Sequence, residues 1–211
     1  MNTHIPIILI IDSAADICSV AIANNAGVIG SIELFEKNIH SEKLTIIIQE
    51  LLKNNNIEYK TLAAIGINKG PGSYTGLRIG TSVAKGMCFA LDIPLLSCDG
   101  LSAYAESILK YHNFNYDFIM TALDARRDEV YATILNKNGD IILPSQPLIL
   151  DDNYNELLRT KCAGSIGIFS NCIDKFDKLT KVKKVYFNGN EYFKSLYLQN
   201  KLFDKYNNNL F

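Results

Sequence analysis

An internal repeat constrains the fold of this chain more than any other feature of its sequence. When Asp12 is placed over Asp124, an offset of 112 residues, residues 12–29 align with residues 124–141 without a gap, and six of the eighteen aligned positions are identical. Each copy starts at the Asp that ends an apolar strand and continues with a polar turn, a second strand, an Asn-x-x-Gly hairpin turn and a third strand. The chain is therefore expected to contain two copies of one folding unit.

Hydrophobic periodicity predicts the other elements. Strands are expected over residues 7–11, 18–23, 28–35, 63–68 and 93–97, and helices over residues 41–53, 75–90 and 101–109. Ser41 is the predicted N-cap of the first helix. The second half is less regular, and there only residues 153–160 predict a helix with comparable clarity.

Two hairpin-plus-helix units, each starting with a strand that ends in Asp, resemble the superfold shared by actin, Hsp70 and the sugar kinases. The predicted fold class is accordingly α/β, a duplicated actin-like and sugar-kinase-like fold with a reduced second lobe. We expect an N-terminal lobe over residues 1–110 and a smaller C-terminal lobe of the same ancestry over residues 111–211.

In that superfold the loops that follow the two aspartates hold the phosphates and the metal ion of ATP. Such loops need glycine, because backbone N–H groups must approach the phosphate oxygens closely. Neither loop here contains a glycine, and the second carries Arg126 and Arg127. An active ATPase is therefore disfavoured. Two interpretations stay open: Asp12 and Arg126 contact a nucleotide or another anion, or these residues only close their own turns.

A glycine-rich segment joins a predicted strand to a predicted helix and reads Gly-Pro-Gly-Ser-Tyr-Thr-Gly from Gly70 to Gly76. It is not a Walker loop, because no Gly-Lys-Ser or Gly-Lys-Thr follows, and it is not a nucleophile elbow, because Thr75 stands where the second glycine would be. The spacing favours tight-turn geometry with a capping hydroxyl. An anion site at Gly72 and Ser73 is the alternative.

The two helices predicted over residues 41–53 and 75–90 carry large apolar side chains on their otherwise polar outer faces, and the second has a small residue at every fourth position. Since these helices should be neighbours, the pattern predicts a protein–protein interface at which the small residues let a partner helix approach closely. The predicted interface residues are Ile39, Ile46, Gly76, Ile79, Gly80, Val83, Ala84 and Met87.

Composition excludes several other classes of protein. Lys and Arg number 21 against 22 Asp and Glu, so no overall positive charge draws the chain to nucleic acid. The longest apolar run, residues 5–11, is too short to span a bilayer and lacks the flanks of a secretory signal. The five cysteines form no C-x-x-C pair, and the histidines form no H-x-x-x-H pair. We therefore expect a reduced, cytoplasmic chain with no membrane contact, no metal site and no catalytic residues of its own.

Three segments of the chain carry a specific resemblance. They are residues 10–21, which begin Ile-Ile-Asp-Ser-Ala, the glycine-rich run from Gly70 to Gly80, and residues 124–131, which read Asp-Ala-Arg-Arg-Asp-Glu-Val-Tyr. Together they resemble the TsaB (YeaZ) family of bacterial proteins over about residues 7 to 136. The family's pattern continues into a Pro-x-Tyr-Leu-Arg/Lys segment that is absent here, so the C-terminal lobe is expected to be truncated or divergent.

The resemblance implies a non-catalytic partner of TsaD, the related catalytic subunit, which transfers threonylcarbamoyl from its adenylate to N6 of adenosine 37 in tRNA. It further implies the ATPase TsaE as a third component, a homodimer when TsaD is absent, and contact with tRNA only through the complex. No cofactor is expected on this chain alone, and ATP and metal are expected in the partner subunits. Two other functions stay open: a small-molecule kinase or ATPase of the sugar-kinase-like superfold, and an RNA-binding protein whose affinity for tRNA depends steeply on salt.

Overall fold

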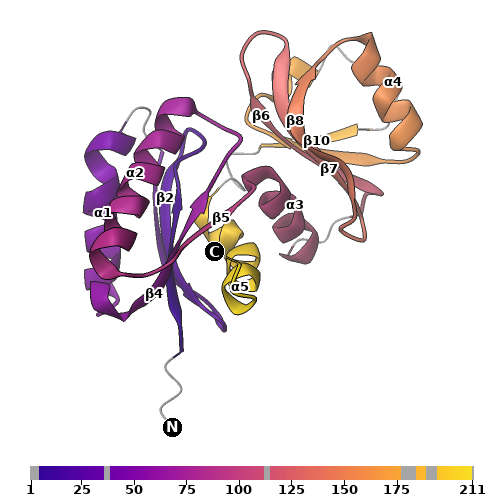
Figure 1. The fold of residues 1–211 in the computed structure, drawn as a ribbon. Coiled ribbons are helices and arrows are strands. Elements are labelled where there is room, and N and C mark those ends of the chain that lie inside the picture. The colour runs from indigo at the N-terminus through magenta and orange to yellow at the C-terminus, as the bar shows by residue number, and fades with distance from the viewer. Residues whose placement is uncertain (1–4, 36–38, 112–114, 177–183, 189–193, 211) are drawn as a thin grey trace. The chain divides into compact units, whose positions relative to one another are not determined.

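The computed structural model describes residues 5–35, 39–111, 115–176, 184–188 and 194–210. Contacts between residues divide the chain into two compact units (Figure 1). The first comprises Met1–Gly100 and Lys194–Phe211, and the second comprises Leu101–Phe193. Each unit is built on one five-stranded sheet.

The strands of the first unit are β1 (Ile7–Asp12), β2 (Cys18–Asn24), β3 (Gly27–Leu34), β4 (Leu62–Asn68) and β5 (Leu95–Cys98). They form a mixed sheet in the order β3-β2-β1-β4-β5. β1 is antiparallel to β2 and parallel to β4. Its continuous apolar run fits this central place, because a strand covered on both faces needs apolar side chains in both directions.

Helices α1 (His40–Asn54) and α2 (Tyr74–Leu91) cover one face of this sheet (Figure 1). The leucines and isoleucines on the inner side of α1 pack with Ala84 and Cys88 of α2 onto β1, β2 and β4. The predicted N-cap of α1 is wrong: Ile39, not Ser41, holds that position, and it makes no side-chain capping hydrogen bond.

The end of the chain covers the other face of the first sheet, through η4 (Ser195–Leu198) and α5 (Gln199–Asn207). Leu202 lies so close to Gly66 of β4 that a Cβ there would collide with it. The backbone N–H of Ser195 donates to Ser19 Oγ (2.8 Å). The predicted lobe 111–211 therefore differs from the structure, in which residues 194–211 join the first unit because their buried apolar side chains complete its core.

The second unit begins with most of α3 (Gly100–Tyr111) and contains α4 (Asp152–Lys161) and η2 (Ile173–Phe176). Its strands are β6 (Phe118–Asp124), β7 (Glu129–Asn136), β8 (Ile141–Ile149), β9 (Ile166–Ser170) and β10 (Lys184–Asn188). Tyr154 and Leu158 of α4 pack with Phe176 onto the sheet. Among the described residues, no helix is both long and apolar enough to cross a membrane.

The predicted duplication is visible in the topology of the two sheets. The second has the order β10-β9-β6-β7-β8, which is the order of the first once β1–β5 are matched with β6–β10. α1 and α4 each follow the third strand of their copy. All eight elements expected in the first 110 residues form, with ends shifted by no more than two residues. The α/β class is confirmed.

The two copies differ by one residue in a way that the ungapped alignment hides. Five residues separate β1 from β2, whereas four separate β6 from β7. Leu9 and Ile11 belong to the core beneath α1, while Met120 and Ala122 belong to the core beneath α4. Because side chains alternate along a strand, Asp12 lies on the face opposite α1, whereas Asp124 lies on the same face as α4. The two aspartates are therefore not equivalent within their units.

Candidate functional site

Asp12 ends β1 and is 1% exposed. Its Oδ1 accepts hydrogen bonds from the N–H of Ala14 (3.1 Å) and from Nδ2 of Asn68 (3.1 Å), the last residue of β4. Asn68 Oδ1 in turn accepts the N–H of Gly70 (2.9 Å). The carboxylate thus ties together the two loops at the carboxyl ends of β1 and β4, which favours the turn-closing interpretation of Asp12.

The Gly-Pro-Gly turn lies directly on the loop that follows β1. The N–H of Ser73 donates to the carbonyl of Ala14 (2.7 Å), and a Cβ at Gly72 would collide with the same carbonyl. Gly70 has φ +102°, a conformation that other residues rarely adopt. Ser73 is the N-cap of α2, and its Oγ accepts the N–H of Gly76 (3.3 Å). The backbone of Gly72 therefore faces the chain's own loop.

The row of small residues on α2 packs inside the first unit. Gly76 and Gly80 lie against Ser13, whose Oγ donates to the carbonyl of Gly76 (2.8 Å), and a Cβ at either glycine would collide with Ser13. Ala84 is fully buried in the core beneath the helices. The prediction that Gly76, Gly80 and Ala84 lie at a partner interface is wrong, because these small residues make room for the chain's own loop and sheet.

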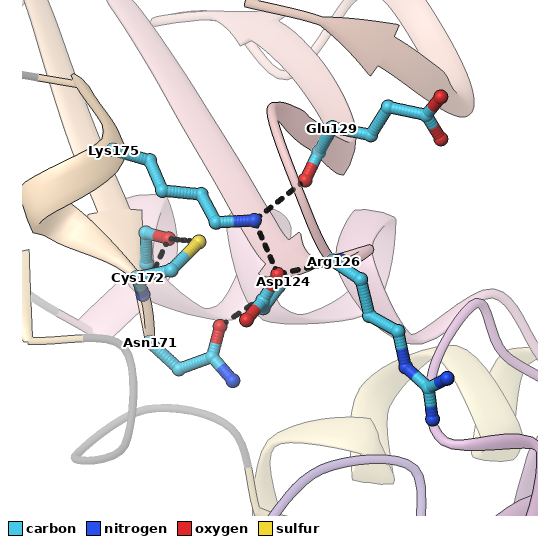
Figure 2. Close-up of polar contacts among 7 residues, drawn as sticks. Asp124, Arg126, Glu129, Asn171, Cys172 and Lys175 are labelled. Atoms are coloured by element: carbon cyan, nitrogen blue, oxygen red, sulfur yellow. Dashed lines mark hydrogen bonds and ion pairs between the residues drawn. The ribbon is translucent and has the colours of Figure 1, made fainter. Parts of the chain in front are cut away.

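Figure 2 shows the polar cluster at the end of β6. Lys175 Nζ lies 2.5 Å from Asp124 Oδ1 and donates to the carbonyl of Glu129 (3.1 Å). Asn171 Oδ1 accepts the N–H of Asp124 (3.0 Å), and Asp124 Oδ1 accepts the N–H of Arg126 (2.7 Å). Lys175 belongs to η2 and Asn171 follows β9, so segments far apart in the sequence meet at one carboxylate.

The electrostatics of this cluster favour an ionised, paired aspartate. Partial burial acts to raise the pKa of Asp124, but the Lys175 ammonium and the N–H of Arg126 outweigh it, so the pKa lies below its ordinary value. Cys172 Sγ lies 3.2 Å from Ser170 Oγ, and burial raises the pKa of this thiol. Cys172 therefore lacks the lowered pKa of a catalytic cysteine.

The residues after β1 and β6 do not fit a metal–nucleotide group. The carboxylates of Asp12 and Asp124 are already bonded by turn N–H groups and by Asn68 or Lys175. Neither loop offers a glycine where a phosphate would need close backbone approach. In the part of the chain that the structure describes, no three His, Cys, Asp or Glu side chains gather as a metal site would require.

Arg126 lies in the turn between β6 and β7. Arg126 and Arg127 have φ +73° and +46°, which is unusual for residues other than glycine, asparagine and aspartate. The N–H of Glu129 donates to the carbonyl of Arg126 (3.0 Å) and closes the turn. The Arg126 side chain is exposed, and its guanidinium group is directed away from Asp124 (Figure 2).

The outward sides of α1 and α2 expose large apolar side chains. Ile46 of α1 is 43% exposed, and Phe89 of α2 is 91% exposed. Beside α1, a groove of about 490 Å³ is lined by Ile39, Ile46 and the exposed Phe35, together with charged side chains of α1 and β3. We call the set Phe35, Ile39, Ile46 and Phe89 the outer apolar face.

The remaining predicted interface residues are less exposed to solvent. Ile79, Val83 and Met87 are partly buried and pack against the core of the first unit. Of the residues that sequence reasoning placed at the interface, Ile39 and Ile46 belong to the outer apolar face. Phe89 is not among the interface residues that the sequence predicted.

Comparison with known proteins places these features in a family. A family model described as TsaD, tRNA N6-adenosine threonylcarbamoyltransferase, matches residues 33–146, more than half of the chain. The tRNA threonylcarbamoyladenosine biosynthesis protein TsaB of Haemophilus influenzae is 31% identical over 124 residues, which cover 59% of this chain and 51% of that protein. The solved structure of YeaZ from Pseudomonas aeruginosa matches with a TM-score of 0.76 at 20% identity, over 97% of this chain and 93% of that one.

The chain belongs to the TsaB (YeaZ) branch of this family. It spans about half the length of the Haemophilus TsaB relative in the sequence match. A polyphosphate/ATP-glucomannokinase from Arthrobacter shares the fold at a TM-score of 0.50 and 8% identity, over 93% of this chain and 99% of that one. The expected sugar-kinase-like superfold is thus confirmed for this TsaB-family chain.

Sequence reasoning missed several residues of the two polar clusters in this TsaB-family chain. The duplication could have revealed the asparagines, because Asn68 ends β4 and Asn171 follows β9, each beside the strand that carries the Asp. Lys175 offers no such signal, since it lies 51 residues after Asp124 in a short, aperiodic turn.

Proposed function

We propose that this TsaB-family chain takes part in forming threonylcarbamoyladenosine in tRNA, as a non-catalytic partner of TsaD with TsaE as a third component. The TsaB relatives of this chain are tRNA threonylcarbamoyladenosine biosynthesis proteins, which supports a role in this process. The clusters around Asp12 and Asp124 support the non-catalytic role, because the chain's own donors hold both carboxylates. ATP and metal then belong to the partner subunits.

The observation that carries the partner role is the outer apolar face. α1 and α2 cover the same side of one sheet, and both leave large apolar side chains uncovered on their outward faces. Large apolar side chains that gather on a protein surface mark interaction sites, and aromatic side chains such as Phe89 are enriched in protein–protein interfaces. TsaD is the proposed occupant, and a second copy of this chain is the occupant when TsaD is absent.

The near-neutral net charge of −1 supports contact with tRNA through the complex rather than by this chain alone. A role on tRNA would place the chain in the cytoplasm. The test is co-expression with TsaD of the same organism, followed by co-purification and a reconstituted assay of threonylcarbamoyladenosine formation. Failure to form a complex would contradict the proposal, and so would ATP-dependent turnover of a small substrate by the isolated chain.

A further inference from the structure

The outward side of α2 carries cations and aromatic side chains but no carboxylate. Four exposed side chains follow one another at spacings of four, seven and four residues, which are close to whole turns of a helix, so they share an arc of about 60°. They are Tyr74, Arg78, Lys85 and Phe89, and we call them the α2 stripe. The small residues of α2 are buried on its other side, so the α2 stripe is open to a second molecule.

The α2 stripe is a local positive patch. α2 contains no Asp or Glu among its 18 residues, although acidic residues slightly outnumber basic ones in the whole chain. α1 differs, because two exposed glutamates on it balance two exposed lysines. The first acidic residue after α2 is its C-cap, Asp92, seven residues beyond Lys85. Among the described residues, neither Arg78 nor Lys85 forms an ion pair, so the chain itself leaves their charges unneutralised.

The guanidinium group of Arg78 lies over the ring of Tyr74. Its Cζ is 4.9 Å from the ring centroid, which is a cation–π contact, and Tyr74 is 72% exposed. The groove beside this pair has a volume of about 370 Å³ and is lined by Tyr74, Leu77, Arg78, Thr81, Ser82 and Lys85. Stacking restrains the guanidinium group and leaves its N–H groups able to donate two parallel hydrogen bonds to a carboxylate.

The residue types of the α2 stripe favour a protein over a nucleic acid as its occupant. Tyr, Phe and Arg are enriched in protein–protein interfaces, and Phe89 is 91% exposed. RNA binding through phosphates draws its strength from many cations, because each contact releases only about one counterion. The α2 stripe offers two cations and an apolar end, which suits a protein surface better.

The charges of the α2 stripe also define the chemistry of that protein surface. A protein that covers the stripe removes water from Arg78 and Lys85. Desolvating two cations is strongly unfavourable unless carboxylates face them. The occupant therefore needs acidic side chains opposite these two residues and apolar side chains opposite Phe89.

We propose that the α2 stripe is the docking site for an acidic surface of a partner protein, on which carboxylates pair with Arg78 and Lys85 and apolar side chains cover Phe89. This inference rests on the proposed function, in which TsaD is the partner, and adds the chemistry that TsaD presents to α2. Opposite charges also attract before contact, so the α2 stripe speeds association and favours this partner over proteins without such an acidic surface.

The test is the affinity of the full chain for TsaD of the same organism, measured by calorimetry at salt concentrations of about 0.05 M and about 0.5 M. We expect the unchanged chain to bind about tenfold more weakly at the higher concentration, because salt screens the charges. At the lower concentration, Arg78→Glu and Lys85→Glu should each weaken binding by about tenfold or more.

Two control variants separate the charge of the α2 stripe from its shape and from the net charge of the chain. Lys85→Arg keeps the positive charge and should bind TsaD as the unchanged chain does. Lys60→Glu reverses an exposed lysine outside α2, changes the net charge by the same amount, and should also leave the affinity unchanged. Circular dichroism of each variant checks that it is folded.

The possible outcomes separate this inference from the proposed function. If the unchanged chain forms no complex with TsaD at either salt concentration, both are contradicted. If the complex forms and the folded Arg78→Glu and Lys85→Glu variants bind as tightly as the unchanged chain, the inference is overturned while the proposed function stands. Binding of tRNA by the chain alone that Arg78→Glu abolishes would assign the α2 stripe to RNA and would also overturn the inference.

Discussion

Lys175 Nζ lies 2.5 Å from Asp124 Oδ1, so the carboxylate that ends β6 is bound by a cation of the chain itself. In the first unit Asn68 donates to Asp12 in a comparable way. Both carboxylates thus serve local structure. We expect the isolated chain to hydrolyse no ATP in a phosphate-release assay. Turnover that disappears in the Asp12→Ala variant would contradict this expectation.

The Asp124–Lys175 pair predicts a pH-dependent contribution to stability. The pKa of Asp124 is lowered in the folded chain, so its stabilising contribution is present above the unfolded pKa of about 3.9 and is lost as the pH falls through the folded pKa. Lys175→Met should lower the free energy of unfolding at pH 7 by about 1 kcal/mol or less, because both side chains are partly exposed. Urea unfolding at pH 7 and at acidic pH measures this change in the free energy of unfolding.

The difference in the free energy of unfolding between the Lys175→Met variant and the unchanged chain should become smaller as the pH falls. Lys60→Met, which replaces an exposed lysine of the other unit, is the control and should have little effect at either pH. If Lys175→Met lowers the free energy of unfolding by the same amount at acidic pH, the loss comes from packing of the lysine side chain and not from the ion pair.

Two glycines of α2 should respond in opposite ways to the same substitution. A Cβ at Gly76 would collide with the carbonyl of Ser13, whereas a Cβ at Gly86 would meet nothing within 4 Å. Gly76→Ala should therefore lower the free energy of unfolding by about 1–3 kcal/mol. Gly86→Ala should raise it by about 0.5–1 kcal/mol, because alanine favours the helix. Urea unfolding measures both, and similar effects at the two positions would contradict the packing of α2 on Ser13.

The buried thiols should be unreactive in the folded chain. Burial raises the pKa of Cys98 to about 12 and that of Cys18 to about 11, with Asp12 adding to the increase in both. The thiolate, which is the reactive form, is therefore scarce near pH 8. We expect Ellman's reagent to label these cysteines only after unfolding. Rapid labelling of Cys18 or Cys98 in native protein, located by mass spectrometry, would contradict the burial of β2 and β5.

Local sequence patterns predicted the helices and strands of the first unit well, but they did not predict which residues contact one another across the fold. The period of α1 and the Asn-x-x-Gly turns give the helix and the hairpins directly, because these signals lie within a few neighbouring residues. The small residues of α2 signal only a close approach, and Ser13, the group that approaches Gly76, is 63 residues away in the sequence. Lys175 is 51 residues away from Asp124 in the sequence, so no spacing rule could reveal the pair.

The one-residue difference between the two copies also could not be predicted from local sequence patterns. Identities such as Asn24 with Asn136 and Gly27 with Gly139 align the hairpin turns, which need these residue types. They do not report that the loop between the first two strands is shorter in the second copy. A shift of one residue exchanges the faces of a strand, and only the core contacts of Ile11 and Ala122 make it visible.

The proposed partner role depends on the outer apolar face. The residues substituted to test it should have well-exposed side chains, so that a substitution disturbs binding and not folding. Ile46 and Phe89 project from α1 and α2, whereas Ile79 packs partly against the core, so that a charge at Ile79 would also disturb folding. Ile141, on β8 of the second unit, is 53% exposed and gives a matched control. Circular dichroism of each variant checks that it is folded.

Co-purification of the Ile46→Asp and Phe89→Asp variants with TsaD of the same organism tests the account most directly. A buried, unpaired carboxylate at an interface costs several kcal/mol, so we expect each folded variant to lose about a hundredfold or more in affinity. Ile141→Asp should bind TsaD as the unchanged chain does. Undiminished binding by both folded variants would contradict the assignment of the outer apolar face as the partner surface.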